Sequence, residues 1–164
     1  MSILTTKHLG KIYEGKVPYT ALSDINFSIE KGEFVAIMGP SGSGKSTLLN
    51  VVSTIDHPTS GNVSIDGQDP HKMNDDELAH FRRSTLGFVF QDFNLIHTLT
   101  VGENIMLPLT IEGIPVPEIK KRTEEVAKML GIQQLLSKRT FEISGGQAQR
   151  TAVGRAVVTN PSLL

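Results

Sequence analysis

The sequence contains no cysteine in its 164 residues. Disulfide bonds and thiolate metal sites are therefore excluded within it, and the absence fits a reducing compartment. The net charge of −1 and the pI of about 6.5 provide no overall positive field for nucleic acid. No apolar run approaches the roughly 18 residues of a membrane-spanning helix, and residues 1–15 lack the apolar region of a secretory signal. We expect a soluble chain whose membrane role, if any, comes through a partner.

The sequence also lacks repeats, low-complexity tracts and linkers. Its length suits one domain with its own core, so we predict a single domain over residues 1–164. The five histidines show no metal-ligand spacing. We interpret them as ordinary surface residues.

A glycine-rich stretch, FVAIMGPSGSGKST, occupies residues 34–47. The apolar run Phe34–Met38 predicts a buried strand, and the residues from 46 to 53 predict a helix. A strand, then G-x-x-x-x-G-K-S, then a helix is the context in which this motif binds phosphate. The sequence therefore predicts nucleotide binding. It does not predict the reaction, because kinases, GTPases, helicases and transport ATPases share this loop.

The residue types of this loop suit a polyphosphate. Gly39, Gly42 and Gly44 allow the unusual φ values that bring backbone N–H groups close to an anion. The helix that follows directs the positive end of its dipole toward the same place. Lys45 adds a mobile positive charge for the β- and γ-phosphates. The Ser46 hydroxyl is a hard oxygen ligand suited to Mg²⁺.

Other segments predict an alternation of strands and helices. Strands are predicted at residues 2–13, 22–29, 62–66 and 86–90. Asn74 and Thr100 are predicted to cap helices, Thr100 in a capping box with Glu103. Pro108 is expected to interrupt the second of these helices after Met106. A charged amphipathic helix is predicted over residues 117–130.

The last predicted helix begins at Ser144, a good N-cap, and runs over residues 147–158. Gly145 and Gly146 fall in its first turn, where each costs roughly 1 kcal/mol relative to alanine. This cost makes sense if a ligand must approach the backbone there. The alternative is an ordinary, loosely formed helix start.

Taken together, Gly39–Thr47, Gln91 and the run Ile143-Ser-Gly-Gly-Gln147 resemble the ATP-binding subunit of ABC transporters. The resemblance covers the whole chain in the family's order and rough spacing. It implies an α/β fold: a P-loop NTPase core with an antiparallel β edge subdomain and a helical signature subdomain. Residues from about 86 to 160 would include the glutamine loop and the helical signature region.

The resemblance also implies roles for individual residues. Tyr13 would stack on adenine, although a packed aromatic is the ordinary interpretation. Lys45 and Gln91 would be catalytic, and Ser46 and Gln91 would contact Mg²⁺. The phosphate loop that binds ATP would comprise Gly39, Pro40, Ser41, Gly42, Ser43, Gly44, Lys45, Ser46 and Thr47. The signature that closes over the γ-phosphate of the opposite subunit would comprise Ser144, Gly145, Gly146 and Gln147.

The same resemblance implies partners and a location. The chain would form a homodimer with ATP sandwiched between subunits, bind no nucleic acid, and lie in the cytoplasm against the inner face of the membrane through a permease. Phe34–Pro40, Phe81–Arg83 and Gly87–Gln91 are similar to the group of macrolide exporters, lipoprotein-releasing ATPases and bacitracin-type peptide transporters. Residues 94–101 are most similar to antimicrobial-peptide members. We expect the apolar stretch from Phe93 to Leu99 to touch a permease helix, through Phe93 and Leu95.

The sequence departs from the family at several positions. Ile143 replaces the usual leucine, and Ala148 stands where a longer polar residue is common. Leu164 falls where the family continues into the Walker B aspartate and the catalytic glutamate, so we expect a truncated domain that binds nucleotide weakly and hydrolyses it poorly alone.

Three other functions stay open. One is a soluble ABC-type ATPase of nucleic-acid repair or translation, and another is a nucleotide-binding module without catalysis. A kinase or GTPase is disfavoured, because the sequence has no Asn-Lys-x-Asp guanine motif.

Overall fold

The computed structural model describes residues 2–164. The chain forms two compact units, one ending at Phe81 and the other running from Arg82 to Leu164. The expectation of one domain over residues 1–164 stays a prediction. No helix between residues 2 and 164 combines the length and the apolar character needed to cross a bilayer.

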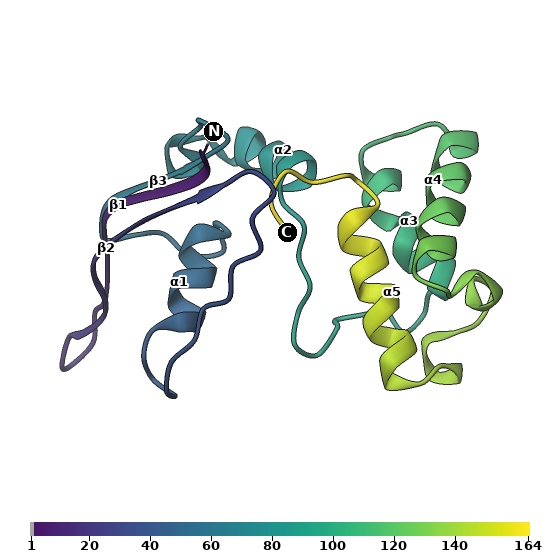
Figure 1. Ribbon diagram of the computed structural model, residues 1–164, viewed down its shortest axis with the longest axis horizontal. Helices are drawn as coiled ribbons and strands as arrows, with labels where there is room; N and C mark the ends of the chain where they lie inside the picture. The colour runs from purple at the N-terminus through teal and green to yellow at the C-terminus, as the bar shows by residue number, and fades with distance from the viewer. Residues whose placement is uncertain (1) are drawn as a thin grey trace. The chain divides into compact units, whose positions relative to one another are not determined.

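The first unit contains a three-stranded antiparallel sheet (Figure 1). Its strands are β1 (Ser2–Tyr13), β2 (Tyr19–Glu30) and β3 (Ser60–Ile65), in the order β2-β1-β3. The central strand β1 pairs with both neighbours. Its register shifts between Thr6 and Leu9 against β2, and between Lys7 and Gly10 against β3. The strands predicted at residues 2–13, 22–29 and 62–66 are therefore confirmed. Burial alternates along the second half of β2, as expected of a strand with one inward face, whereas β1 buries neighbouring residues such as Ile3 and Leu4.

Helix α1 (Lys45–Val52) contacts β2, and Val51 and Val52 in its last turn are buried. A short 3₁₀ turn, η1 (Pro70–Lys72), leads to α2 (Asp75–Thr85). The predicted cap of α2 is confirmed: Asn74 Oδ1 accepts a hydrogen bond from the Glu77 amide at 3.0 Å. The Glu77 carboxylate accepts one from the Asn74 amide at 2.9 Å, which completes a reciprocal cap.

The prediction of a buried strand at Phe34–Met38 is wrong for this structure. The segment has no strand assignment, and Phe34 and Met38 are 98% and 88% exposed. A strand exists only when a neighbour completes its hydrogen-bond ladder. Among residues 2–164 no neighbouring strand pairs with this run, so its apolar composition alone does not bury it.

The second unit is built on three helices that pack side by side (Figure 1). They are α3 (Val101–Ile111), α4 (Val116–Met129) and α5 (Gly145–Val157). Two 3₁₀ turns, η2 (Gln133–Leu135) and η3 (Thr140–Glu142), connect α4 to α5. All three helices begin within one residue of their predicted starts, and both reciprocal side-chain hydrogen bonds of the Thr100–Glu103 capping box are present. The core of this unit comprises Val101, Ile105, Leu109, Ile119, Ala127, Ile132, Leu135 and Val158.

Two sequence expectations fail in this unit. Pro108 does not end its helix: α3 continues through it to Ile111, because Ile105 and Leu109 hold the helix against the core on either side. The strand expected at residues 86–90 reduces to one bridge, in which Leu86 pairs in parallel with Leu163. No longer ladder forms there within residues 2–164, so the apolar run again lacks the partners that a strand requires.

Candidate functional site

The predicted phosphate loop lies immediately before α1, with its last glycine as the helix N-cap. Gly44 has φ 87° and offers no side-chain acceptor to the first turn of α1. The first backbone N–H groups of a helix have no partner inside the helix, and they carry the positive end of its dipole. The start of α1 can therefore accept an anionic group. The phosphate loop itself stays a prediction.

Two glycines of this loop are required by geometry. Gly42 and Gly44 have φ values of 80° and 87°, in the left-handed region that favours glycine. A Cβ atom at Gly44 would also lie 2.6 Å from the carbonyl oxygen of Ala21 on β2. The loop can lie this close to the sheet only because Gly44 has no side chain. Tyr19 adds a contact from β2, with its hydroxyl 3.3 Å from the Gly42 carbonyl oxygen.

The side chain of Lys45 folds back across the loop that precedes it. Its Nζ atom donates to the carbonyl oxygens of Gly39 at 2.9 Å and Pro40 at 2.7 Å, with Ser43 Oγ at 3.4 Å. The ammonium group is therefore held by neutral oxygens. A phosphate oxygen would be a stronger acceptor for it than these carbonyls. Ser46, on the first turn of α1, is exposed.

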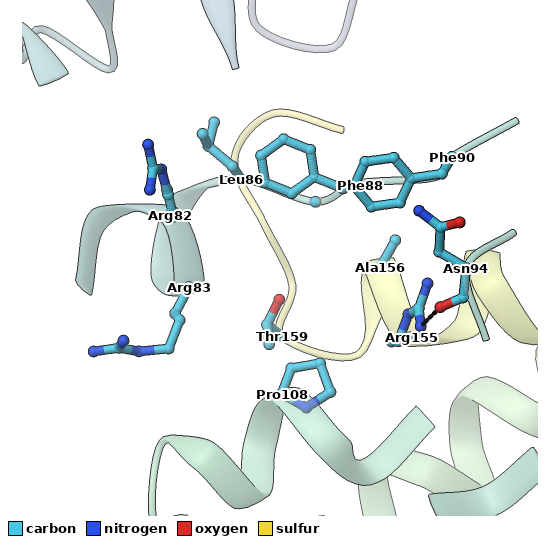
Figure 2. Close-up of a pocket in the computed structure, with 11 residues that line it drawn as sticks. Arg82, Arg83, Leu86, Phe88, Phe90, Asn94, Pro108, Arg155, Ala156 and Thr159 are labelled. Atoms are coloured by element: carbon cyan, nitrogen blue, oxygen red, sulfur yellow. Dashed lines mark hydrogen bonds between the residues drawn. The ribbon is translucent and has the colours of Figure 1, made fainter. Parts of the chain in front are cut away.

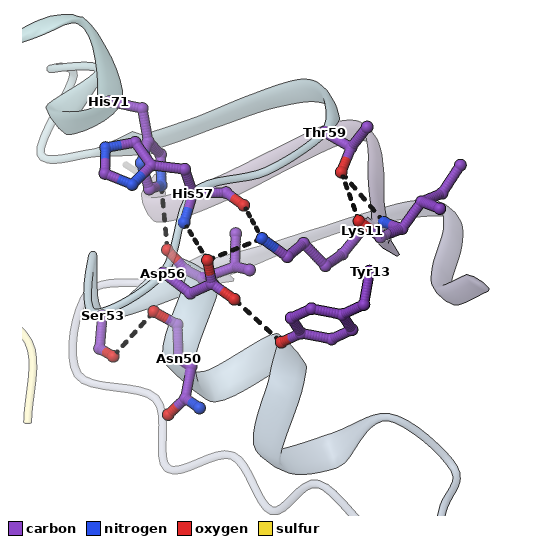
Figure 3. Close-up of polar contacts among 10 residues, drawn as sticks. Lys11, Tyr13, Asn50, Ser53, Asp56, His57, Thr59 and His71 are labelled. Atoms are coloured by element: carbon purple, nitrogen blue, oxygen red, sulfur yellow. Dashed lines mark hydrogen bonds and ion pairs between the residues drawn. The ribbon is translucent and has the colours of Figure 1, made fainter. Parts of the chain in front are cut away.

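Tyr13, the expected adenine-stacking residue, stands at the end of β1 in a polar network (Figure 3). Its hydroxyl donates to Asp56 Oδ2 at 2.9 Å, and Lys11 Nζ lies 4.8 Å from the ring centroid. Lys11 also contacts Asp56 Oδ1 at 2.7 Å and donates to the His57 carbonyl oxygen at 2.8 Å. These contacts fix the tilt of the ring, and Tyr13 as a whole is 39% exposed.

The charge of Asp56 is central to this network. The hydrogen bond from the Lys11 ammonium lowers the pKa of the Asp56 carboxyl, with further help from the Tyr13 hydroxyl and the His57 amide and some opposition from burial. Asp56 is thus ionised near neutral pH. Sequence patterns missed Lys11 and Asp56, because only the pairing of β1 with its neighbours brings residues 43 to 46 positions apart into contact.

The signature Ser144–Gln147 forms the start of α5 in the second unit. Ser144 is the N-cap, as predicted: its Oγ accepts from the Gln147 amide at 3.4 Å, while Gln147 Oε1 accepts from the Ser144 amide at 2.9 Å. This arrangement commits the acceptor atoms of both side chains. It leaves the Ser144 hydroxyl hydrogen and the Gln147 Nε2 hydrogens as donors.

Gly145 and Gly146 are exposed at this helix start. A Cβ at Gly145 would meet nothing within 4 Å, and one at Gly146 would meet only the end of the Arg150 side chain at 4.0 Å. Packing within the chain therefore does not require glycine at either position. The absence of side chains leaves the backbone N–H groups open to an outside ligand, which favours a ligand site over a loosely formed helix start.

Gln91 lies in an exposed turn of the second unit, at the start of an irregular stretch that runs to α3. The apolar residues after it differ in exposure: Leu95 is only 9% exposed, whereas Ile96 is 40% exposed. The expected permease contact through Leu95 is therefore wrong, since Leu95 faces inward.

The predicted site residues are divided between the two units. Tyr13 and the phosphate loop belong to the first unit, and Gln91 and the signature belong to the second.

No cluster of three or more histidine or acidic side chains suited to a metal ion occurs within residues 2–164. Ser46 Oγ stays the predicted protein ligand of a divalent cation at the phosphate loop, where Mg²⁺ would also bind oxygens of the phosphate.

Comparison with known proteins gives a consistent result. The sequence profile of the ABC transporter family matches residues 22–164. The chain is 58% identical over 163 residues to the ABC transporter ATP-binding protein YxdL of Bacillus subtilis, covering 99% of this chain and 63% of that protein. It is 46% identical over 165 residues to the bacitracin export ATP-binding protein BceA of Halalkalibacterium halodurans, covering 100% of this chain and 65% of that protein.

A solved structure shows the same fold. The ATP-binding cassette MJ0796 of Methanocaldococcus jannaschii, a dimer bound to ADP and phosphate in a post-hydrolysis state, matches with a TM-score of 0.87 and 44% identity. The match covers 96% of this chain and 70% of that one. The present chain spans 63% and 65% of the lengths of YxdL and BceA. The chain belongs to the ABC transporter family, and the relatives that it matches are ATP-binding proteins.

Proposed function

We propose that the protein is the ATP-binding and ATP-hydrolysing subunit of an ABC transporter that exports a small molecule or peptide through a partner permease. One observation carries the proposal: two helices, α1 and α5, begin at glycine-containing turns whose first backbone N–H groups are open to an anion. One such start with a lysine beside it suits a phosphate chain. Two such helix starts suit a phosphate chain that is bound from two sides.

ATP would be held at α1 by the backbone of the loop and by Lys45. The fit is supported by the cradle itself, since a Cβ at Gly44 would strike Ala21 and the ammonium of Lys45 already stands over the loop. In this proposal Lys45 exchanges its carbonyl partners for phosphate oxygens. Mg²⁺, when bound, offsets the negative charge of the phosphates. Ser46 would hold the ion through its hydroxyl.

Gln91 and Tyr13 each have a separate proposed role. Gln91 would orient the attacking water and touch the Mg²⁺ through its exposed amide, because a neutral amide can accept and donate at once. Tyr13 would present a ring face to adenine, with its tilt set by Asp56 and with Lys11 close to the ring. Stacking of this kind is worth roughly 1–3 kcal/mol per base.

The start of α5 is proposed to serve a second copy of the chain. Ser144 and Gln147 have donor hydrogens to spare, and Gly145 leaves the backbone open. We propose that in a homodimer this start closes over the γ-phosphate bound at α1 of the partner. The dimeric state of the relative MJ0796 supports this arrangement.

A membrane permease is the proposed second partner, which would place the protein on the cytoplasmic face of the membrane. The surface offered to it is the stretch after Gln91, where Phe93 is half-buried and Ile96 is exposed. Similarity to a protein that exports bacitracin supports a peptide antibiotic as the cargo. The net charge of −1 gives no support to a role on nucleic acid.

The test is ATP turnover by the purified full-length protein, with and without Lys45→Ala. We expect Mg²⁺-dependent hydrolysis that Lys45→Ala lowers by about 100-fold, because the positive charge that stabilises the transferred phosphate is lost. Binding of ATP without turnover would favour a non-catalytic nucleotide-binding module. Activity that depends on added DNA or RNA would favour the soluble class.

A further inference from the structure

The segment that follows Gln91, here named the post-glutamine loop (Phe93–Thr98), is held in an unusual way. Its own backbone hydrogen bonds are local: the amides of Phe93 and Asn94 reach the carbonyls of Phe90 at 3.0 Å and Asp92 at 2.6 Å. Both residues have positive φ, 61° and 45°. A phenylalanine in that conformation is strained, and such strain persists only where the surroundings enforce it.

The enforcing contact comes from α5. Arg155 donates from Nη2 to the Phe93 carbonyl oxygen at 2.7 Å and from Nη1 to the Asn94 carbonyl oxygen at 2.6 Å. The planar guanidinium thus spans two successive carbonyls of the loop. Figure 2 shows the hydrogen bond to Asn94. Burial lowers the pKa of Arg155, but an arginine keeps its charge at neutral pH. A half-buried charge with two short, charge-assisted hydrogen bonds is a strong anchor.

Two further side chains, both from the second unit, hold the rest of the loop by hydrogen bonds to its backbone. Asn104 of α3 is fully buried. Its Oδ1 accepts from the Ile96 amide at 2.8 Å and its Nδ2 donates to the Ile96 carbonyl at 3.1 Å. Arg139, just before η3, donates to the Thr98 carbonyl oxygen. The side chains that bind the loop backbone therefore all belong to the part of the chain that carries the signature.

Arg155 lies on the helix that Ser144 begins, eleven residues further along. One rigid element therefore has the signature at its N-terminus and the anchor of the post-glutamine loop near its C-terminus. A helix of this length moves as a body, so displacement of its start also displaces the anchor.

We propose that Arg155 is a positioning residue that links Gln91 to the signature helix through the backbone of the post-glutamine loop. When the signature closes on a nucleotide, this link changes the orientation of Gln91. This inference rests on the proposed function of the two motifs. It adds a mechanical link within one subunit: when the signature of that subunit contacts a nucleotide, the glutamine of the same subunit moves.

Hydrogen exchange of the full-length protein tests the anchor directly. Arg155→Ala should speed amide exchange in the peptide covering residues 91–97 by about tenfold, because two anchoring bonds are lost. Arg155→Lys should restore part of the protection, since one ammonium replaces the two-pronged guanidinium. Arg122→Ala is the matched control. Its guanidinium pairs with Glu118 on α4, and within residues 2–164 it makes no hydrogen bond to the loop. Unchanged exchange in a folded Arg155→Ala or Arg155→Lys variant would overturn the proposal.

Steady-state ATP turnover tests the link to Gln91. Arg155→Ala should lower kcat by about tenfold while KM for ATP changes by less than about twofold, because the phosphate loop is untouched. The double variant with Gln91→Ala should lose no more than Gln91→Ala alone. Losses that multiply would show that Arg155 acts independently of Gln91 and would refute the link. If the unaltered protein hydrolyses no ATP, the proposed function fails, and the exchange data alone decide whether Arg155 anchors the loop.

Discussion

The hydroxyl of Tyr13 donates a 2.9 Å hydrogen bond to the carboxylate of Asp56. The partner comes from the turn after α1, so the orientation of the ring depends on a residue 43 positions away. The carboxylate also binds Lys11, which stands 4.8 Å from the ring centroid. Adenine recognition should therefore depend on Asp56 although Asp56 is not expected to touch the base.

Replacement of Asp56 by alanine should free the ring of Tyr13. We expect the affinity for ATP to fall roughly threefold to tenfold, since part of a stacking interaction is lost. Binding of inorganic tripolyphosphate should not change, because the phosphate loop is intact. Calorimetric titration of both ligands measures the difference. Combining Asp56→Ala with Tyr13→Ala should cost no more than Tyr13→Ala alone, and an additive loss would mean that the carboxylate acts elsewhere.

The same contact predicts a dependence of stability on pH. Because the Lys11 ammonium lowers the pKa of Asp56, the folded state releases this proton more easily than the unfolded state. The stabilisation is complete above the ordinary value of 3.8 and is lost as the pH falls through the lower folded value. Denaturant unfolding between about pH 5 and about pH 2 should show a smaller acid destabilisation in Asp56→Asn. An equal loss in both proteins would exclude this contribution.

Gly42 and Gly44 provide a matched pair of substitutions. Both have positive φ, but a Cβ at Gly42 would meet nothing within 4 Å, whereas one at Gly44 would lie 2.6 Å from the Ala21 carbonyl oxygen. Gly42→Ala should cost about 1–2 kcal/mol from backbone strain alone. Gly44→Ala should cost clearly more, because the loop must also move away from β2. Urea unfolding of both variants measures the ranking, and equal losses would contradict the close approach of loop and strand.

Substitutions at Leu95 and Ile96 distinguish an effect on folding stability from an effect on permease binding. Leu95 is buried, so Leu95→Ser should destabilise the protein by about 2–3 kcal/mol. Ile96 is 40% exposed, so Ile96→Ser should leave the unfolding midpoint nearly unchanged but weaken binding to the permease. Co-purification with the permease from native membranes, compared with chemical unfolding, distinguishes the two. Full retention of permease by a folded Ile96→Ser variant would move the contact elsewhere.

Sequence patterns predicted those elements that depend on local chemistry. Capping residues such as Asn74, Thr100 and Ser144 mark helix starts because each satisfies amides within three residues of itself. The glycines of the phosphate loop were predicted for the same reason, since a positive φ is a local requirement.

The expectations that failed depend on distant partners. Phe34–Met38 has the composition of a buried strand, but composition does not supply the neighbour that a strand needs. Pro108 was expected to interrupt α3, and packing on both sides of it outweighs its local preference. Arg155 and Asp56 were missed because their roles arise from contacts 61 to 62 and 43 residues away, which no local pattern encodes.

The central proposal is that each ATP is held by the phosphate loop of one subunit and the signature of the other. Lys45→Ala disables the first, and Gly145→Asp disables the second by placing a negative charge at an open helix start without a clash. Sedimentation of full-length variants with Mg²⁺ and a slowly hydrolysed ATP analogue measures pairing. Each variant alone should stay monomeric, whereas an equimolar mixture should form heterodimers with one intact composite site. A mixture that remains as monomeric as its components would contradict the shared site.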